Sequence, residues 1–147
     1  MRQLLRHAAQ LGYSVRVWDL GDAMAGQTDT VDRVITLNLG LTLHEHRSTL
    51  AHECGHAYYG HDCTDPVTER RARKYAATLL IEPSEYARLE RINPDQHWLA
   101  EEFSVTVDII EDYEELCLTP LRGVTYANAR DGVGQWSFMS QRVGALA

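Results

Sequence analysis

Residues 50–63 of the chain read LAHECGHAYYGHDC, and they bring three histidines, a glutamate and two cysteines close together. Within this stretch His52, Glu53 and His56 form the pattern H-E-x-x-H. On a helix, residues four apart lie one turn apart on the same face, so both imidazoles can converge on one metal ion. Glu53 then lies where it can take a proton from a metal-bound water. The pattern predicts a metal site, although a surface helix with a polar face can carry the same letters.

The flanking residues predict that this stretch is helical from about Leu43 to Tyr59. Thr42 and Glu45 fit a capping box at the start, and Gly60 is a suitable residue for the C-terminal stop. The apolar positions of this helix are expected to be Leu43, Leu50, Ala51, Cys54 and Ala57.

A catalytic zinc site needs a third protein ligand, and Glu69 is the best candidate. It lies in a second helix, which begins at Pro66 after the cap Asp65 and ends near Ile81. Glu69 shares a face with Ala72, Ala76 and Leu79 or Leu80, whereas Arg70, Arg71, Arg73 and Lys74 mostly point elsewhere. The small residues would allow close packing on the first helix, and a buried carboxylate needs a partner such as a cation. The alternative is a first-turn glutamate favoured by the helix dipole.

Other residues compete for the same role. Asp62 lies six residues after His56, at the third-ligand position of the metzincin pattern, but that pattern needs a glycine where this chain has Tyr59. His61 and Cys63 could belong to a structural zinc site, although no C-x-x-C pair completes one. We expect them to form the turn that leads out of the helix. His44 and His46 are expected to be exposed residues at the helix start, and Cys54 to pack as a small apolar residue.

The rest of the chain predicts an α+β fold. The patterns indicate a helix over 2–11, strands over 13–20 and 33–41 with turns and a short strand between them, and helices over 84–92, 95–103 and 105–117. We expect a small N-terminal β-sheet packed on the H-E-x-x-H helix, followed by a mostly helical C-terminal half. One domain is expected over 1–147, with its core at about 4–117 and an irregular tail over 118–147.

Composition narrows the class of function. The formal net charge of −7 disfavours a general nucleic-acid or anionic-membrane binder, because both need a basic surface. The chain has three cysteines, too few and an odd number for a secreted disulfide framework. Neither a signal peptide nor an apolar run long enough to span a membrane is evident, so we expect a soluble cytoplasmic protein.

Residues 99–116, LAEEFSVTVDIIEDYEEL, resemble the sequence pattern at the start of a helix-turn-helix motif. Their charge is acidic, whereas a DNA-binding motif needs basic residues. Between Arg91 and Arg122 there are eight Asp or Glu and no Lys or Arg. Such a surface would repel DNA. The segment is therefore interpreted as a helical pair packed on the core, or as an acidic surface for a basic partner.

Two segments together resemble the ImmA/IrrE family of metallopeptidases. They are RSTLAHECGHAYYGH at 47–61 and ERRARKYAATLLIEP at 69–83, and the resemblance extends over about 4–117. It implies a small gluzincin-like fold, zinc held by His52, His56 and Glu69, and Glu53 as the general base. Another divalent metal would also suit two histidines and one carboxylate.

The resemblance also implies a role in gene regulation. Members act on a helix-turn-helix repressor that is often encoded beside them on phages or mobile elements, in which case this chain would work in the host cytoplasm. This chain shows no fused DNA-binding domain, so we expect a separately encoded protein substrate and no direct contact with nucleic acid or membrane. The strand over 33–41 is expected to be an exposed edge to which the substrate adds. The alternative functions are a non-catalytic regulator that binds a transcription factor and a purely structural metal site.

Overall fold

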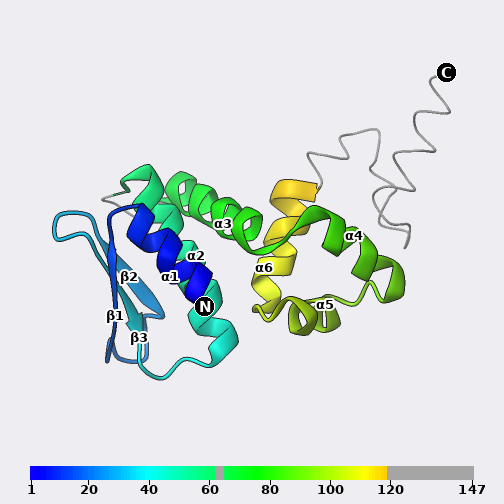
Figure 1. Cartoon of the computed structure of the whole chain (residues 1–147), viewed down its shortest axis with the longest axis horizontal. Coiled ribbons are helices and arrows are strands. Elements are labelled where there is room, and N and C mark those ends of the chain that lie inside the picture. Colours follow the sequence, from blue (N-terminus) through cyan, green and yellow to red (C-terminus); the bar gives the residue numbers. More distant parts are fainter. Residues whose placement is uncertain (62–64, 119–147) are drawn as a thin grey trace, which may run out of the picture.

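The computed structural model describes residues 1–61 and 65–118, and its α+β architecture confirms the predicted fold class. The three strands form one small sheet, and α1 and α2 lie beside it (Figure 1). Helix α3 leads from α2 to the group formed by α4, α5 and α6 at the other end of the molecule (Figure 1). The elements are α1 (Arg2–Gln10), β1 (Ser14–Trp18), β2 (Gly26–Asp29), β3 (Val34–Asn38), α2 (Leu43–Tyr59), α3 (Pro66–Leu80), α4 (Pro83–Ile92), α5 (Gln96–Phe103), α6 (Val107–Asp112) and the π-helical turn η1 (Tyr113–Leu118).

The strand order of the sheet is β1-β3-β2, with β1 parallel and β2 antiparallel to β3. The prediction that the strand over 33–41 is an exposed edge is therefore wrong. Strand β3 pairs on both sides and is the central strand, and its Ile35 and Leu37 are buried. The two edges are β1 and β2, and β2, whose sequence GQTD is mostly polar, is the edge that lines the cleft.

Helix α2 has the boundaries that the sequence predicts. Thr42 and Glu45 form both hydrogen bonds of the capping box. At the other end Gly60 adopts the left-handed conformation, with φ 65° and ψ 37°. Most of the expected core positions of this helix are buried, but the side chain of Leu43 is 67% exposed, because it lies in the first turn, beyond the elements that cover the helix.

Helices α2 and α3 pack closely through small residues, as expected from the alanines of α3. Ala72 and Ala76 are both fully buried. A Cβ atom added to Gly55 of α2 would lie 2.8 Å from the Cα of Ala72, so only glycine allows this approach. The close approach brings the first turn of α3 beside the H-E-x-x-H face of α2.

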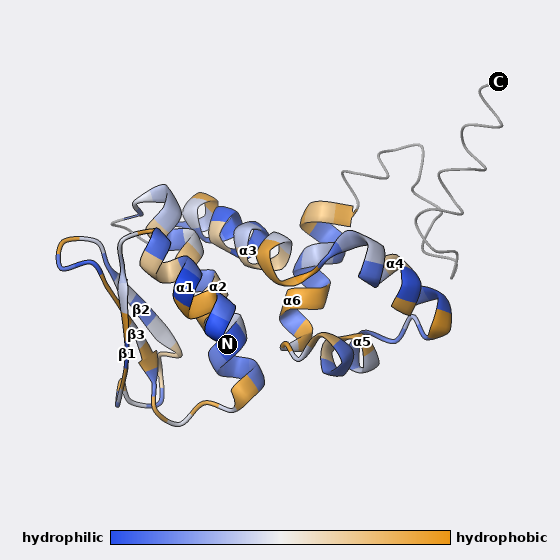
Figure 2. Ribbon diagram, in the orientation of Figure 1, coloured by the Kyte–Doolittle hydropathy of each residue, from blue (hydrophilic) through white to orange (hydrophobic). Residues whose placement is uncertain are grey.

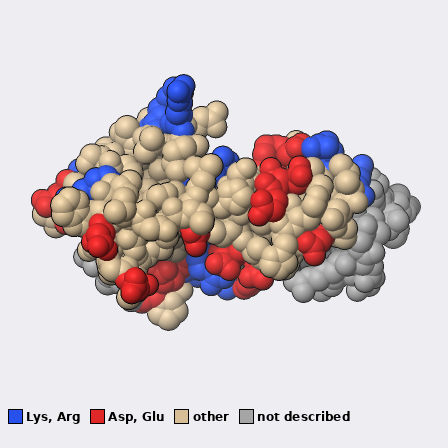
Figure 3. Space-filling model, turned by 90° about the horizontal axis from the view of Figure 1, so that it is seen from below, with Lys and Arg blue, Asp and Glu red and all other residues tan. Residues whose placement is uncertain are grey.

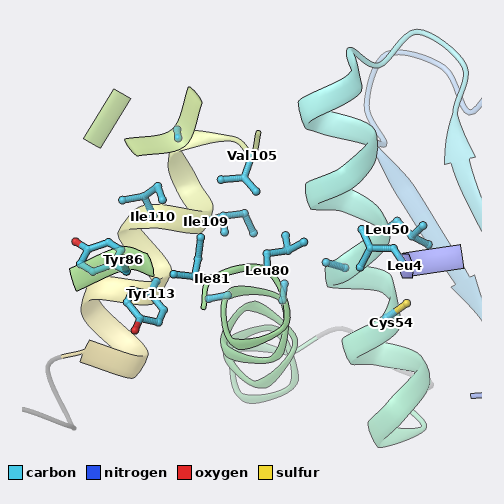
Figure 4. Packing of buried hydrophobic residues seen from close by; sticks show 14 of the residues in the cluster. Leu4, Leu50, Cys54, Leu80, Ile81, Tyr86, Val105, Ile109, Ile110 and Tyr113 are labelled. Atoms are coloured by element: carbon cyan, nitrogen blue, oxygen red, sulfur yellow. The ribbon is translucent and has the colours of Figure 1, made fainter. Parts of the chain in front are cut away.

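A second part of the core lies among α3, α4, α5 and α6 (Figure 4). In Figure 2, hydrophilic and hydrophobic residues alternate around α4, as expected for a helix with one face in a core. The predicted helix over 105–117 is α6 continued by η1, with Ser104 in the left-handed conformation before it. Leu99, Ile109 and Ile110 are buried here, so residues 99–116 do form a helical pair packed on the core.

Candidate metal centre

Three side chains converge at the junction of α2 and α3. The Nε2 atoms of His52 and His56 lie 3.0 Å apart. Glu69 places Oε2 3.3 Å from His52 Nε2 and Oε1 3.3 Å from His56 Nε2. The ligand atoms of the three residues all lie within 4.8 Å of one another, so the structure brings together the three predicted ligands.

The spacing of these atoms fits a zinc ion. In tetrahedral coordination with bonds of about 2.1 Å, neighbouring ligand atoms lie about 3.4 Å apart. The observed separations of 3.0 and 3.3 Å are close to that value. Two imidazole nitrogens and one carboxylate are the ligand types that catalytic zinc sites use, in which a fourth position is left for water or substrate.

The surroundings of both histidines favour the neutral imidazole, which is the form that binds metal. Burial lowers the pKa of His52, and the nearby Glu69 carboxylate only partly opposes this effect. Burial also lowers the pKa of His56, and the second largest cause is the adjacent His52. Since a metal binds the unprotonated imidazole nitrogen, a lowered pKa removes competition from protons.

Glu53 lies on α2 between the two histidines, and its carboxylate is nearly enclosed. Its exposed fraction is 7%, and burial raises its pKa to about 7. The Thr28 hydroxyl opposes the shift, because it donates a hydrogen bond to Glu53 Oε2 at 2.7 Å. A carboxyl group with a pKa near neutrality can both accept and release a proton under ordinary conditions.

Thr28 is a site residue that the sequence did not reveal. It lies on the edge strand β2, which approaches α2 so closely that a Cβ atom on Gly26 would lie 2.6 Å from Thr49 Cγ2 and 3.1 Å from Glu53 Cγ. Gly26 therefore permits the contact between Thr28 and Glu53. A short strand was expected in this region, but nothing in the local sequence GQTD indicates that it lies next to Glu53.

The three candidate ligands and Glu53 line a cleft of about 1050 Å³. One side is formed by residues 23–31, which include β2, and by the neighbouring face of α2. The other side comes from α3 and α6, where Arg73 donates from Nε to Asp112 Oδ1 at 2.9 Å and also pairs with it through Nη2. The cleft is large enough for an extended segment of polypeptide.

Several predictions for individual residues can now be compared with their positions. Glu69 is half-buried rather than buried, with 34% of its side chain exposed, because it lies in the first turn of α3 and lines the open cleft. Arg73 does not point away from the site, since it lines the cleft one turn after Glu69. His44 and His46 lie outside the ligand set as expected, but they are half-buried rather than exposed. Burial raises the pKa of Cys54 to about 12, in line with its packing role.

The structure tests only one of the rival candidate ligands, His61. Asp62 and Cys63 lie outside the described residues, as does the tail from 119 onward. His61 does not join the ligand set; it lines the cleft and places its Nδ1 atom 3.2 Å from His56 Nδ1.

None of the described helices is long and apolar enough to cross a membrane.

Comparison with known proteins adds two findings. Residues 8–112 match the model of the Peptidase_M78 family, described as the IrrE N-terminal-like domain. A solved structure of a Mycobacterium tuberculosis transcriptional regulator has a similar fold, with a TM-score of 0.62 and 18% sequence identity over 81% of this chain. The chain spans 42% of that structure, so the similarity concerns one part of the larger protein. No curated protein matches the chain significantly.

Proposed function

The chain belongs to the Peptidase_M78 family of IrrE N-terminal-like domains, and from this premise we propose that it is a zinc-dependent endopeptidase. The observation that carries the proposal is the pairing of a three-residue metal site with Glu53, a nearly buried carboxylate in the same cleft. A site that only bound metal would gain nothing from Glu53, because burying an acid without a role is costly.

His52, His56 and Glu69 would hold the zinc ion, which would supply Lewis acidity toward the scissile carbonyl and the attacking water. Glu53 accepts the proton of the attacking water and delivers it to the leaving nitrogen. Thr28 holds the Glu53 carboxylate in position through its hydrogen bond. The packing of β2 against α2 excludes water from the back of Glu53 and so keeps its pKa near neutrality.

The substrate would lie along β2 and would add to the sheet as a further strand. Strand β2 is at the edge of the sheet and contributes all of its residues to the cleft lining. An edge strand offers unpaired backbone donors and acceptors, which bind an extended peptide without regard to its side chains. This arrangement favours hydrolysis within a polypeptide rather than at its end.

The charges of the cleft support a basic protein segment as substrate. Asp29, Asp108 and Glu111 line the cleft, and within the described residues none of them forms an ion pair with Lys or Arg. In the view of Figure 3, acidic side chains are distributed along the molecule and basic ones gather at a few places. A DNA-binding repressor presents basic segments, so a separately encoded helix-turn-helix repressor is the proposed substrate, in the cytoplasm of the cell or of a phage host.

The proposal is tested with Glu53→Gln. The variant keeps the shape of the side chain but cannot accept a proton, so cleavage of a repressor or of a basic test peptide should fall by about 10² to 10⁴-fold. Zinc content, measured by metal analysis, and the circular dichroism spectrum should stay unchanged. Full cleavage by Glu53→Gln would refute the enzyme proposal.

A non-catalytic regulator that binds a transcription factor through the same fold is the second candidate. The fold similarity to a protein named as a transcriptional regulator favours keeping it in view. Under this alternative, Glu53→Gln would bind the partner and regulate transcription as the unaltered chain does, and the partner would remain intact on a gel.

A further inference from the structure

We propose that His61 is the positioning residue that orients His56 for metal binding. This inference rests on the metal site of the proposed function but not on peptide cleavage. His61 follows Gly60 at the end of α2, and its Nδ1 atom lies 3.2 Å from His56 Nδ1. The two imidazole rings meet nearly edge to face, with centroids 5.3 Å apart and an interplanar angle of 71°.

The direction of the contact follows from the geometry of the ligands. His56 directs Nε2 toward His52 and Glu69, so Nε2 is the nitrogen that would bind the ion. A neutral imidazole that binds metal through Nε2 keeps its proton on Nδ1. His56 Nδ1 therefore donates, and His61 Nδ1 accepts. Such a hydrogen bond from the far nitrogen of a metal-binding histidine selects the tautomer and holds the ring plane.

The end of α2 explains how His61 reaches this place. The Gly60 N–H donates to Ala57 O at 3.4 Å, and the His61 N–H donates to His56 O at 3.0 Å. These two bonds define a Schellman motif, which needs the left-handed conformation that Gly60 adopts. In this motif the residue after the glycine is brought back onto the last turn of the helix. Here that residue is His61, and the side chain beneath it is the ligand His56.

His61 is itself held in place by packing. The Tyr59 ring stacks on it with a centroid separation of 5.3 Å and an interplanar angle of 14°. The Nε2 atom of His61 is buried and has no hydrogen-bond partner within residues 1–61 and 65–118. The bond to His56 is thus the polar side-chain contact that the described structure gives this ring, which indicates a role at the ligand rather than in the core.

The test compares the zinc affinity of the full chain and two variants, measured by competition with a chromogenic chelator. His61→Phe keeps a ring that can stack on Tyr59 but removes the acceptor, and its zinc dissociation constant should rise by about 10 to 100-fold. His61→Asn places an amide oxygen near the position of Nδ1, and its zinc affinity should stay within about threefold of the unaltered chain.

A matched control is the same change at His46→Phe. His46 is also on α2, is half-buried and contacts a backbone oxygen, Asn38 O at 3.0 Å, but it lies outside the metal site. Its loss should leave zinc affinity unchanged. Thermal unfolding of the metal-free proteins, followed by circular dichroism, separates loss of zinc binding from loss of fold.

Nuclear magnetic resonance supplies a second measurement. In the zinc-loaded protein the His56 Nδ1 proton should be visible and protected from exchange, and it should be lost in His61→Phe. The inference is overturned if His61→Phe binds zinc as tightly as the unaltered chain, or if His61→Asn loses as much affinity as His61→Phe. Since neither measurement involves cleavage, failure here and failure of Glu53→Gln are distinguishable.

Discussion

The cleft wall formed by α2 and β2 is packed and shielded from water, whereas the wall formed by α3 and α6 is more open and carries ion pairs. On the first wall Glu53 is 7% exposed, and its close neighbours are Thr28 and Gly26. On the second wall the side chains of Glu69 and Arg73 are 34% and 45% exposed. Two carboxylates on opposite walls of one site thus have different surroundings.

Under the proposed function, the difference separates two chemical tasks. A general base works best with a pKa near the working pH, and desolvation raises the Glu53 pKa to about 7. A metal ligand must reach the ion, and the half-exposed Glu69 carboxylate lies 3.3 Å from the Nε2 atoms of both His52 and His56. The wall formed by α2 and β2 (the dry wall) is suited to proton transfer. The wall formed by α3 and α6 (the open wall) is suited to holding the ion and contacting substrate.

The largest effect is expected for Glu69→Gln, which removes the charge of the open wall at the metal. Losing one of three ligands should weaken zinc binding by on the order of 10³-fold, since a structural zinc site with four ligands is worth about 10–16 kcal/mol. The measurement is chelator competition. Glu115→Gln, a change of the same charge at an exposed residue of the same half, is the control and should bind zinc normally. Equal losses in both variants would contradict the assignment of Glu69.

The next effect concerns the dry wall in the metal-free protein. The folded pKa of Glu53 is about 7 and its ordinary value is 4.5, so the folded state binds this proton more tightly than the unfolded state. Stability is therefore lost as the pH rises from 4.5 to 7, by about 3 kcal/mol. In chelator, Glu53→Gln should unfold at a higher temperature than the unaltered chain at pH values above this range, and at nearly the same temperature near its lower end.

Thermal unfolding scans across pH provide the measurement. Both proteins should lose stability in acid through their histidines, which are buried in the neutral form, so only the difference between the two curves reports Glu53. A constant difference at all pH values would mean that Glu53 is not desolvated in the metal-free fold.

The smallest effect is expected for Thr28→Val, which keeps the shape of the side chain but removes its hydroxyl. The hydroxyl lowers the pKa of Glu53, so without it the acidic limb of the pH–rate profile should move to higher pH. Cleavage near neutrality should fall by roughly tenfold, the usual value of a hydrogen bond to a charged group. Thr28→Ser retains the donor and should behave as the unaltered chain. A profile unchanged in Thr28→Val would remove Thr28 from the mechanism.

Much of the site was readable from the sequence because its parts are local. The H-E-x-x-H spacing, the capping box at Thr42 and the left-handed Gly60 depend on residues within a few positions of each other. Glu69 was found because helical periodicity placed it in line with Ala72 and Ala76. The π-helical end of α6 was missed, since nothing in its spacing separates it from an α-helix.

The failures share a cause in long-range contacts. Strand order could not be read, because β1 and β3 have similar apolar patterns and only packing decides which lies in the middle. Arg73 was expected to point away from the face of Glu69, but Asp112, far along the chain, holds it in the cleft wall.

The sequence by itself therefore determined the H-E-x-x-H helix with its two ends, and the three candidate ligands on that helix and the next one, since helical geometry repeats over short distances. The tertiary structure alone decided which strand borders the cleft, that Thr28 holds Glu53, and that the ring of His61 reaches His56. These contacts form only when separate elements pack together, or when the chain beyond a helix folds back onto it. The burial that shifts the pKa of Glu53 and the contact that orients His56 exist only after this packing.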